Sequence, residues 1–136
     1  MSYGCSGPLQ VAIYQHLTTD AALAALVGDA IHDTPPPGPV TGTYVVLGAE
    51  EARDLSDKTS GAADHRIMVS VVSDAEGFLT AKQVAGAVSD ALVDASPSMS
   101  RGRVVSLRFL RARARRVRSG QVRRIDLIFR VLVDDD

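Results

Sequence analysis

The chain contains few of the residues on which redox and metal chemistry depend. Its 136 residues include one cysteine, three histidines and no tryptophan. A single thiol excludes a disulfide within the chain and argues against a metal cluster built on cysteines. We therefore expect a protein made in a reducing cytoplasm. The cysteine, Cys5, lies near the N-terminus without the surroundings of a nucleophile, and we expect its thiol to sit on a frayed chain end.

Long hydrophobic runs are also missing. The strongest apolar stretches, such as residues 67–72, are far shorter than the roughly 20 residues of a membrane-spanning helix. The first residues contain no basic segment leading into an apolar one, so we expect no secretory signal. A hydrophobic fraction of 46% and a charged fraction of 23% exclude a disordered or collagen-like chain. This length predicts one domain, residues 1–136, with a single core.

The motifs of common catalytic sites are absent. The sequence has no glycine-rich phosphate-binding loop and no Gly-x-Ser-x-Gly nucleophile elbow. No two of the histidines have the spacing of helical metal ligands, and the acidic residues 50–57 lack the ligand pattern of a calcium loop. We therefore predict that the protein is not an enzyme, with no catalytic, cofactor-binding or metal-binding residues.

Charge is divided unevenly along the chain, although the net charge is only −1. Residues 1–100 carry four basic and twelve acidic side chains, whereas residues 101–133 carry eleven arginines and a single acid, Asp126. Three aspartates end the chain. This division predicts one acidic and one basic surface. Two explanations remain open: a polyanionic ligand, or self-association of the basic surface with the acidic surface of another copy.

The hydrophobic periodicity predicts an α+β fold. The ranges expected to be helical are 8–17, 21–27 and 76–94, and those expected to be strands are 44–48, 66–72, 104–113 and 122–133. Ser73 and Glu76 match a capping box for the third helix. Val105, Leu107 and Phe109 are expected on one face of their strand. The order α-α-β-β-α-β-β predicts a mainly antiparallel four-stranded sheet with helices packed on one face.

Three segments are predicted to connect these elements. Prolines and glycines make residues 34–43 an extended loop, because proline lacks the backbone donor that helices and central strands require. The polar residues 49–63 either extend the preceding strand or form a long loop, and we predict the loop. Residues 111–121 are predicted to form an arginine-rich hairpin tip, with Ser119 and Gly120 as its turn signal.

An arginine run near the C-terminus is the strongest functional signal. Arg111, Arg113 and Arg115 alternate, so an extended backbone places them on one face, with Arg116 and Arg118 pointing the other way. Unpaired guanidinium groups are costly to bury and need water, phosphate or carboxylate. The charge density favours nucleic acid, but the run has no aromatic residue to stack on bases. Self-assembly explains both halves of the charge division.

The order of these motifs resembles that of tail-completion proteins, specifically the tail terminators of long-tailed bacteriophages and gene transfer agents. The resemblance covers nearly the whole chain, although the arginine-rich hairpin carries more charge than the family pattern. The matching segments are 9–17, 20–29, 31–33, the proline-rich loop with 44–48, Lys58-Thr59, Gly61, 65–73, the alanine-rich helix and 104–109.

The resemblance implies a structural virion component at the head-proximal end of the tail, assembled in the cytoplasm of a bacterial host. Such subunits form a homohexameric ring that caps the tail tube, stops its polymerisation and docks the tail to the head. The implied partners are other copies, the tail tube protein and a head–tail connector or stopper protein. DNA passes through the lumen without sequence-specific binding, and neither a membrane nor a cofactor is involved.

Two alternatives remain: a nucleic-acid-binding module that uses the arginine-rich hairpin, and a different ring protein of the head–tail junction. In the ring, a head-to-tail interface suits a subunit with one acidic and one basic surface. We predict that the five hairpin arginines meet carboxylates of an adjacent subunit or tail protein. The candidate carboxylates are Glu50, Glu51, Asp54 and Asp57.

Overall fold

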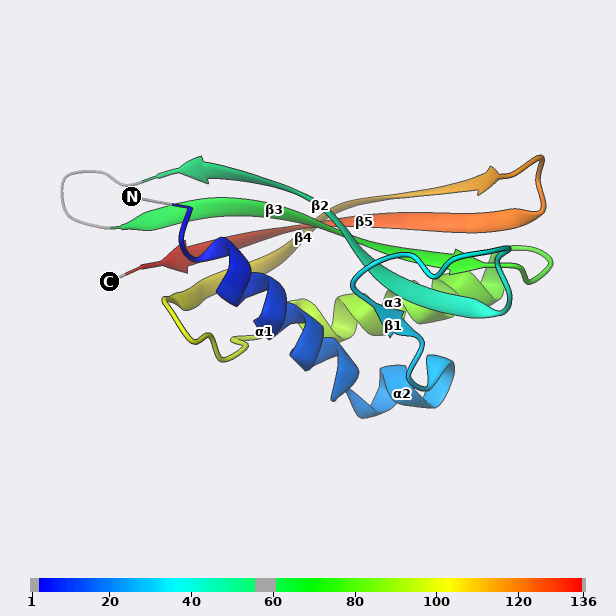
Figure 1. Cartoon of the computed structure of the whole chain (residues 1–136), viewed down its shortest axis with the longest axis horizontal. Helices are drawn as coiled ribbons and strands as arrows, with labels where there is room; N and C mark the ends of the chain where they lie inside the picture. The colour runs from blue at the N-terminus through cyan, green and yellow to red at the C-terminus, as the bar shows by residue number, and fades with distance from the viewer. Residues whose placement is uncertain (1–2, 56–60, 136) are drawn as a thin grey trace.

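The structure, a computed structural model, describes residues 3–55 and 61–135. In this part of the chain, three helices lie on one face of a five-stranded sheet (Figure 1). The helices are α1 (Ser6–Thr18), α2 (Ala21–Val27) and α3 (Leu79–Leu92). The strands are β1 (Ile31–His32), β2 (Thr43–Asp54), β3 (Ala62–Ser73), β4 (Arg103–Val117) and β5 (Val122–Asp134).

The predicted α+β architecture, with a mainly antiparallel sheet and helices on one face, is confirmed. The strand order is β1-β2-β3-β5-β4, and every neighbouring pair is antiparallel except β1 and β2, which are parallel. The predicted count of four strands is wrong, because Ile31 and His32 pair with Val45 and Val46 as a fifth strand. A strand of two residues is too short to produce a periodic pattern.

The strands run further than predicted. The expected loop over residues 49–63 is wrong at both ends, since β2 continues through Asp54 and β3 begins at Ala62. The Leu55 N–H also donates to the Ala62 carbonyl at 3.0 Å. Most of the expected hairpin tip, residues 111–121, is likewise strand, because β4 extends through Val117. Polar residues are compatible with these strands because one face of the sheet is uncovered.

One helix prediction is confirmed, and the predicted start of another is wrong. The range predicted for α2 is confirmed, and the Asp20 side chain caps it by accepting the Leu23 N–H at 2.9 Å. The predicted capping box of α3 is wrong. The Ser73 hydroxyl instead accepts the Ala75 N–H at 3.1 Å, and α3 begins at Leu79 without a side-chain cap.

The main core lies between the helices and the sheet. A smaller buried cluster lies on the opposite side at one end of the sheet, formed by Tyr44, Val46, Val72 and Val122. The inward side chains of β5 are all buried, as the alternation predicts: Ile125, Leu127, Phe129, Val131 and Val133. They pack with residues of all three helices, including Leu9, Ile13, Leu17, Leu23, Val84, Val88 and Leu92.

A bulge changes the predicted face of β4. The pairing with β5 shifts between Val104 and Ser106, so Val104 is buried and Val105 is 49% exposed. The expectation that Val105 shares the inward face is therefore wrong. Leu107 is fully buried, and Phe109 contacts Phe129 edge-on with ring centroids 5.9 Å apart.

The region around Cys5 joins the two ends of the described chain. Cys5 is fully buried, which corrects the expected frayed thiol, and burial raises the pKa of its thiol. A Cβ atom on Gly102 would lie 2.7 Å from the Cys5 Sγ atom. The Arg101 guanidinium donates to both carboxylate oxygens of Asp135, at 2.9 and 2.8 Å. These contacts hold the start of α1 beside the end of β5.

Candidate interaction surface

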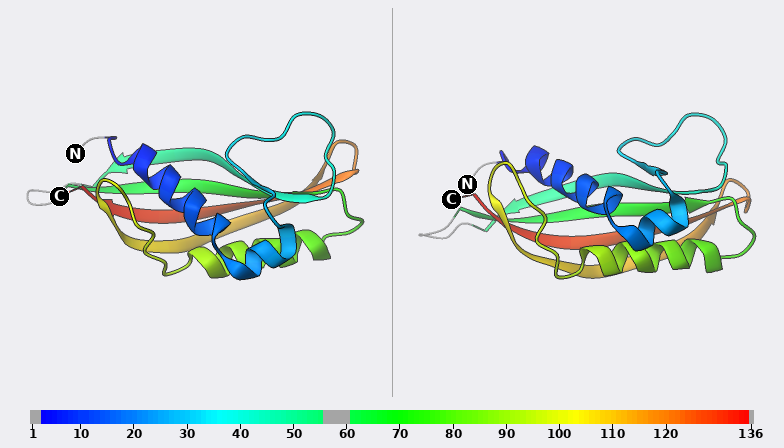
Figure 2. Two further views of the ribbon diagram at one scale, coloured as in Figure 1. Left: turned by 60° about the horizontal axis from the view of Figure 1, so that its bottom comes forward. Right: turned by 90° about the horizontal axis from the view of Figure 1, so that it is seen from below.

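The helices lie in front of the sheet in both views of Figure 2, and the opposite face of the sheet carries none of the described helices. Directly paired residues project to the same side of a sheet, so the pairing register identifies the residues on this uncovered side. We call this side the open face. Its charged residues among those described are Glu51, Arg53, Asp64, Arg66, Arg103, Arg108, Arg111, Arg113, Arg115, Arg124, Asp126, Arg130 and Asp134.

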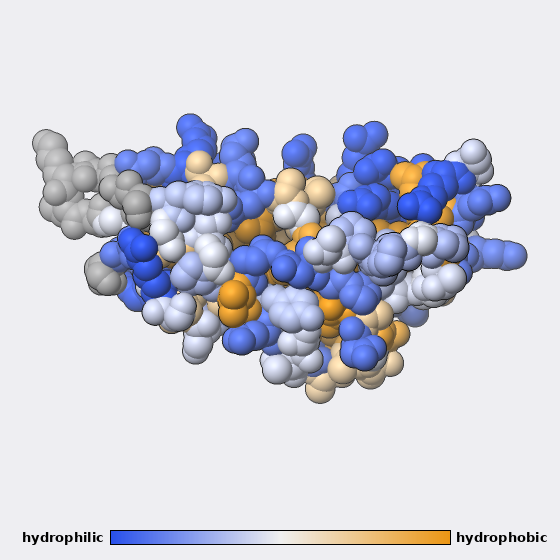
Figure 3. All heavy atoms as spheres, viewed as in Figure 1, coloured by the Kyte–Doolittle hydropathy of each residue, from blue (hydrophilic) through white to orange (hydrophobic). Residues whose placement is uncertain are grey.

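The open face is strongly basic, with nine arginines and four acids in that set. The opposite side is acidic. Residues 6–33 and 74–95, which hold the helices and which we call the helical layer, carry seven acids and one basic residue, Lys82. In Figure 3 the upper edge, formed by the open face, is mostly hydrophilic, whereas apolar residues gather at the lower edge over α2. The charge division along the sequence thus becomes a division between two sides of the molecule.

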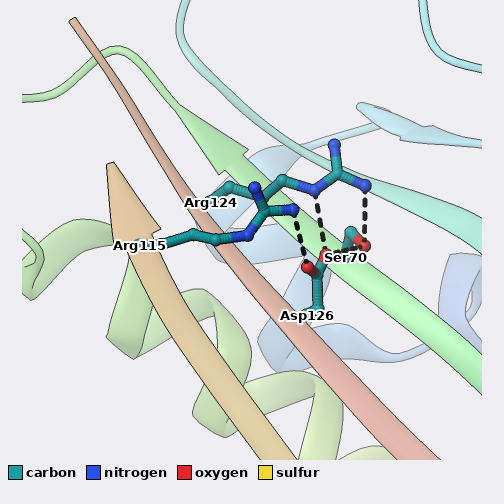
Figure 4. A network of polar contacts seen from close by, with 4 residues as sticks. All are labelled: Ser70, Arg115, Arg124 and Asp126. Carbon is teal, nitrogen blue, oxygen red and sulfur yellow. Dashed lines mark hydrogen bonds and ion pairs between the residues drawn. The ribbon is translucent and has the colours of Figure 1, made fainter. Parts of the chain in front are cut away.

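Asp126 organises a network that joins three strands (Figure 4). Its carboxylate accepts hydrogen bonds from Arg124 Nε at 2.9 Å, Arg115 Nη2 at 3.2 Å and the Ser70 hydroxyl at 2.6 Å. Arg124 also donates to the Ser70 hydroxyl at 3.2 Å. Burial alone would raise the pKa of Asp126, but these hydrogen bonds outweigh burial and hold the pKa below its ordinary value. The network thus fixes the side chains of Arg115 and Arg124 on the open face of the sheet.

Asp64 binds a second pair of arginines on the same face. This buried carboxylate accepts from Arg130 Nε at 2.9 Å and forms an ion pair with Arg66 at 3.7 Å. The buried Asp64 and the half-buried Asp126 therefore each face two guanidinium groups. Because one carboxylate balances only one arginine, positive charge remains on the open face.

Five exposed arginines of β4 and its turn have no such partners among the described residues, whereas Arg103 at the start of β4 binds Asp134. Within residues 3–55 and 61–135, no hydrogen bond or ion pair involves the side chains of Arg108, Arg111, Arg113, Arg116 or Arg118, and all five are exposed. Their charge is available to another molecule.

The structure brings three of the predicted arginines together. Arg111, Arg113 and Arg115 lie on the open face, as the alternation predicts, and Arg115 differs from the other two because Asp126 binds it. Arg116 pairs with Arg123 and points to the side of the helices. Arg118 lies in the turn with a φ of 52°.

The predicted carboxylates occupy different environments. Glu51 is exposed on the open face, where it pairs in register with Arg66. Asp54 is exposed at the end of β2. Asp57 lies outside the described residues. Glu50 points to the helix side, where it belongs to a cluster within its own subunit.

The Glu50 cluster fixes the N-terminal segment to the sheet. Glu50 accepts hydrogen bonds from the Tyr3 hydroxyl, from the Ser6 hydroxyl at 2.7 Å and from His65 Nδ1 at 2.9 Å. Burial would raise the pKa of Glu50, but these bonds more than offset it and hold the pKa below its ordinary value. Residue spacing gave no signal for this cluster, because Tyr3 and Ser6 are far from Glu50 in sequence.

A shallow hollow occupies the middle of the open face. It has a volume of about 760 Å³, an apolar floor and a charged rim. The floor is formed by Met68, Ile128 and Leu110, the last being the extra residue of a bulge between Phe109 and Arg111. Glu51, Arg66 and Arg111 are among the rim residues. The hollow therefore offers another molecule an apolar contact at its centre and charged side chains at its edge.

Neither a membrane-spanning helix nor a group of metal ligands is found among the described residues. None of the helices in residues 3–55 and 61–135 has the length and apolar character needed to cross a membrane. Within the same ranges, no three histidine, cysteine, aspartate or glutamate side chains are grouped so that they would hold a metal ion.

A broad, charged and uncovered sheet face defines a protein that binds other macromolecules over a surface. The sequence profile of the tail completion protein gp17 family matches residues 11–134, and the chain belongs to that family. Its role is therefore that of a structural tail-completion protein of a phage-type virion. A solved chain from the "Virion of native gene transfer agent (GTA) particle" is 58% identical, with a TM-score of 0.91. The match covers 98% of this chain and 99% of that one. No curated protein matches the chain.

Proposed function

We propose that the protein is a tail terminator: copies form a ring, a homohexamer, that caps the tail tube, stops its polymerisation and docks the tail to the head or connector. The observation that carries this proposal is the pair of oppositely charged sides on a tail-completion subunit. A subunit with two complementary surfaces associates head to tail, and such an interface closes into a ring when the rotation between subunits permits.

In this ring the exposed arginines meet carboxylates. Arg111, Arg113, Arg116 and Arg118 have no partner within the described part of their own subunit, and the side chain of Arg115 is 41% exposed although Asp126 binds it. Their partners are carboxylates of an adjacent subunit or of a tail protein. Of the candidates predicted from the sequence, Glu51 and Asp54 are exposed, whereas Glu50 is held inside its own subunit.

The experiment that tests this function combines mass and tube length. Light scattering after size exclusion, at low and moderate salt, gives an oligomer near six times the 14.4 kDa chain. Added to polymerising tail tube protein, the wild type arrests elongation, whereas the double variant Arg111→Glu/Arg113→Glu leaves tubes growing. Tubes that elongate equally with and without the wild type would contradict the proposal.

The excess of positive charge on the open face supports a second candidate, a nucleic-acid-binding module. Such a module binds duplex DNA as an isolated subunit, and its affinity falls steeply with salt because arginines release counterions from the phosphates. A stopper or connector ring is the third candidate. It binds head proteins and leaves tube elongation unchanged, so the same purified protein discriminates all three.

A further inference from the structure

We infer that the open face of one subunit packs against the helical layer of a second copy, with α2 of the second copy seated over the apolar hollow. This inference rests on the proposed head-to-tail ring and names the two surfaces that form its interface. The open face and the helical layer lie on opposite sides of the subunit (Figures 1 and 2). Association between them is therefore heterologous, as a ring requires.

The sequence of α2 is unusual for a surface helix. Its seven residues, Ala-Ala-Leu-Ala-Ala-Leu-Val, contain no polar side chain. Only Leu23 is buried in the subunit, whereas Leu26 is 47% exposed and the four alanines are exposed. A helix that is apolar all round is normally covered on all sides. The outer side of α2 therefore provides a small, smooth apolar contact for another molecule.

Carboxylates surround this apolar contact. Asp29 follows the Gly28 cap of α2 and is exposed, and its side chain forms no hydrogen bond or ion pair within the described residues. Asp33 is exposed and accepts a hydrogen bond from Gln10. No basic residue lies between residues 6 and 33. The α2 side of the subunit thus has an apolar centre and an acidic border.

The open face has the complementary arrangement. The hollow presents Met68, Ile128 and Leu110 at its centre, with Leu110 being 40% exposed. Arg111 stands at its rim, and Arg108 and Arg113 lie on either side of Arg111 along β4. An acidic border laid against these arginines supplies the carboxylates that the unpaired guanidinium groups lack.

The same observations favour a second copy over DNA. A phosphate backbone would pair with the arginines but would leave the apolar floor of the hollow without a matching surface. The hollow contains no aromatic side chain on which a base could stack. DNA would also leave the apolar side of α2 exposed. Contact between two copies covers the hollow and α2 and pairs both sets of charges.

The test uses two variants. In each of them one of the two proposed contact surfaces is altered and the other is left intact. The open-face variant carries Arg108→Glu, Arg111→Glu and Arg113→Glu, and the helical-layer variant carries Ala25→Arg and Asp29→Arg. The control variant Glu76→Arg makes the same charge reversal as Asp29→Arg within the helical layer but outside the α2 contact, at an exposed position between β3 and α3. Circular dichroism and thermal melting establish that each variant is folded. Sedimentation velocity then measures the mass of each variant and of an equimolar mixture of the first two.

We expect each blocked variant to be monomeric, with self-association weakened on the order of 100-fold or more. The mixture forms a dimer of twice 14.4 kDa that cannot extend, because one intact open face meets one intact helical layer. The control variant assembles like the wild type.

Two results would overturn the inference. One is a mixture that stays monomeric at the highest soluble concentration, whether or not the wild type assembles. The other is an open-face variant that still forms the wild-type oligomer. Arrest of tube elongation by the wild type, measured in parallel, separates failure of this interface from failure of the proposed function. A mixture without dimer, together with duplex DNA bound through the open face, would assign that face to nucleic acid.

Discussion

Two carboxylates, the buried Asp64 and the half-buried Asp126, determine how the arginines of the open face are presented. Each binds two guanidinium groups and so fixes their orientation without cancelling their combined charge. A flexible arginine loses side-chain entropy when it meets a partner, and an arginine that is already fixed loses less. The network in Figure 4 therefore serves both the stability of the subunit and the surface it offers.

Removal of the Asp126 charge tests the structural part of this argument. Asp126→Asn leaves Arg115 and Arg124 facing each other without a carboxylate, so we expect the free energy of unfolding at neutral pH to fall by about 1–3 kcal/mol. Urea denaturation measures this loss. Arg113→Gln is the matched control. Arg113 lies directly opposite Asp126 in the register but forms no hydrogen bond or ion pair with it among the described residues, so its replacement changes stability by less than about 0.5 kcal/mol. Equal losses in the two variants would contradict the network.

Glu50 gives the molecule a defined acid sensitivity. Its pKa lies below the ordinary value in the folded subunit, so the ionised form stabilises the fold. That stabilisation is complete above the pKa of the unfolded chain and is lost as the pH falls through the lower, folded value. Glu50→Gln should therefore cost about 1–3 kcal/mol near pH 7, and the difference from wild type should shrink below about pH 4.

The neighbouring residue provides the control for this measurement. Glu51 is exposed on the open face, and Glu51→Gln should leave the stability near pH 7 nearly unchanged. Unfolding is followed in urea at several pH values between about 3 and 7, across the range in which carboxylates titrate. A Glu50→Gln variant with the acid sensitivity of the wild type would show that the cluster with Tyr3, Ser6 and His65 contributes nothing.

At the scale of elements, two glycines distinguish close packing from helix propensity. Gly102 has a φ of +74°, and an added Cβ would lie 2.7 Å from Cys5 Sγ and 2.9 Å from the Asp134 carbonyl oxygen. Gly102→Ala should therefore lower the free energy of unfolding by about 1–3 kcal/mol. Gly86 lies inside α3 with no atom within 4 Å of an added Cβ, so Gly86→Ala should raise stability by about 0.5–1 kcal/mol. Thermal melting compares the two variants. Melting temperatures that shift in the same direction would show that close packing at Gly102 and helix propensity at Gly86 are not the factors that determine these changes.

The elements that the sequence predicts well are those with local signals. The helix α2 is bounded by the cap residue Asp20 and by Gly28, and both are visible without tertiary information. The alternation of β5 likewise identified its buried residues. The outer part of β2 was missed because Glu51 and Arg53 point to an uncovered face, so this strand reads as a polar loop. The two-residue β1 exists only through its pairing with β2.

The candidate site was likewise predicted where a local sequence pattern indicates it and missed where it depends on tertiary contacts. A period of two residues is enough to place Arg111, Arg113 and Arg115 on one face. The sequence does not reveal which of them is free, because the partner of Arg115 comes from the next strand. The engagement of Glu50 was equally hidden, since Tyr3 lies 47 residues away. Bulges in β4 have no sequence signature here, and one of them places Leu110 at the hollow.

At the scale of the whole molecule, the separation of charge between two sides predicts how assembly responds to salt. If the open face meets the helical layer of the next copy, the attraction between them is screened over about 10 Å at 0.1 M salt and over less at higher concentrations. Raising sodium chloride from about 50 to 500 mM should then weaken self-association by about tenfold or more. Sedimentation velocity across this range measures the effect.

The apolar contact between α2 and the hollow sets a limit on this effect. Burial of apolar surface is not screened by salt, so association should level off at high salt rather than vanish. The variant Leu26→Ala separates the two contributions. It removes exposed apolar surface from α2 without changing charge, and it should weaken association by a similar factor at low and high salt. Arg113→Gln should instead weaken association chiefly at low salt. If both variants show the same salt dependence, charge and apolar contact do not act on separate parts of one interface, and the pairing of α2 with the hollow is incorrect.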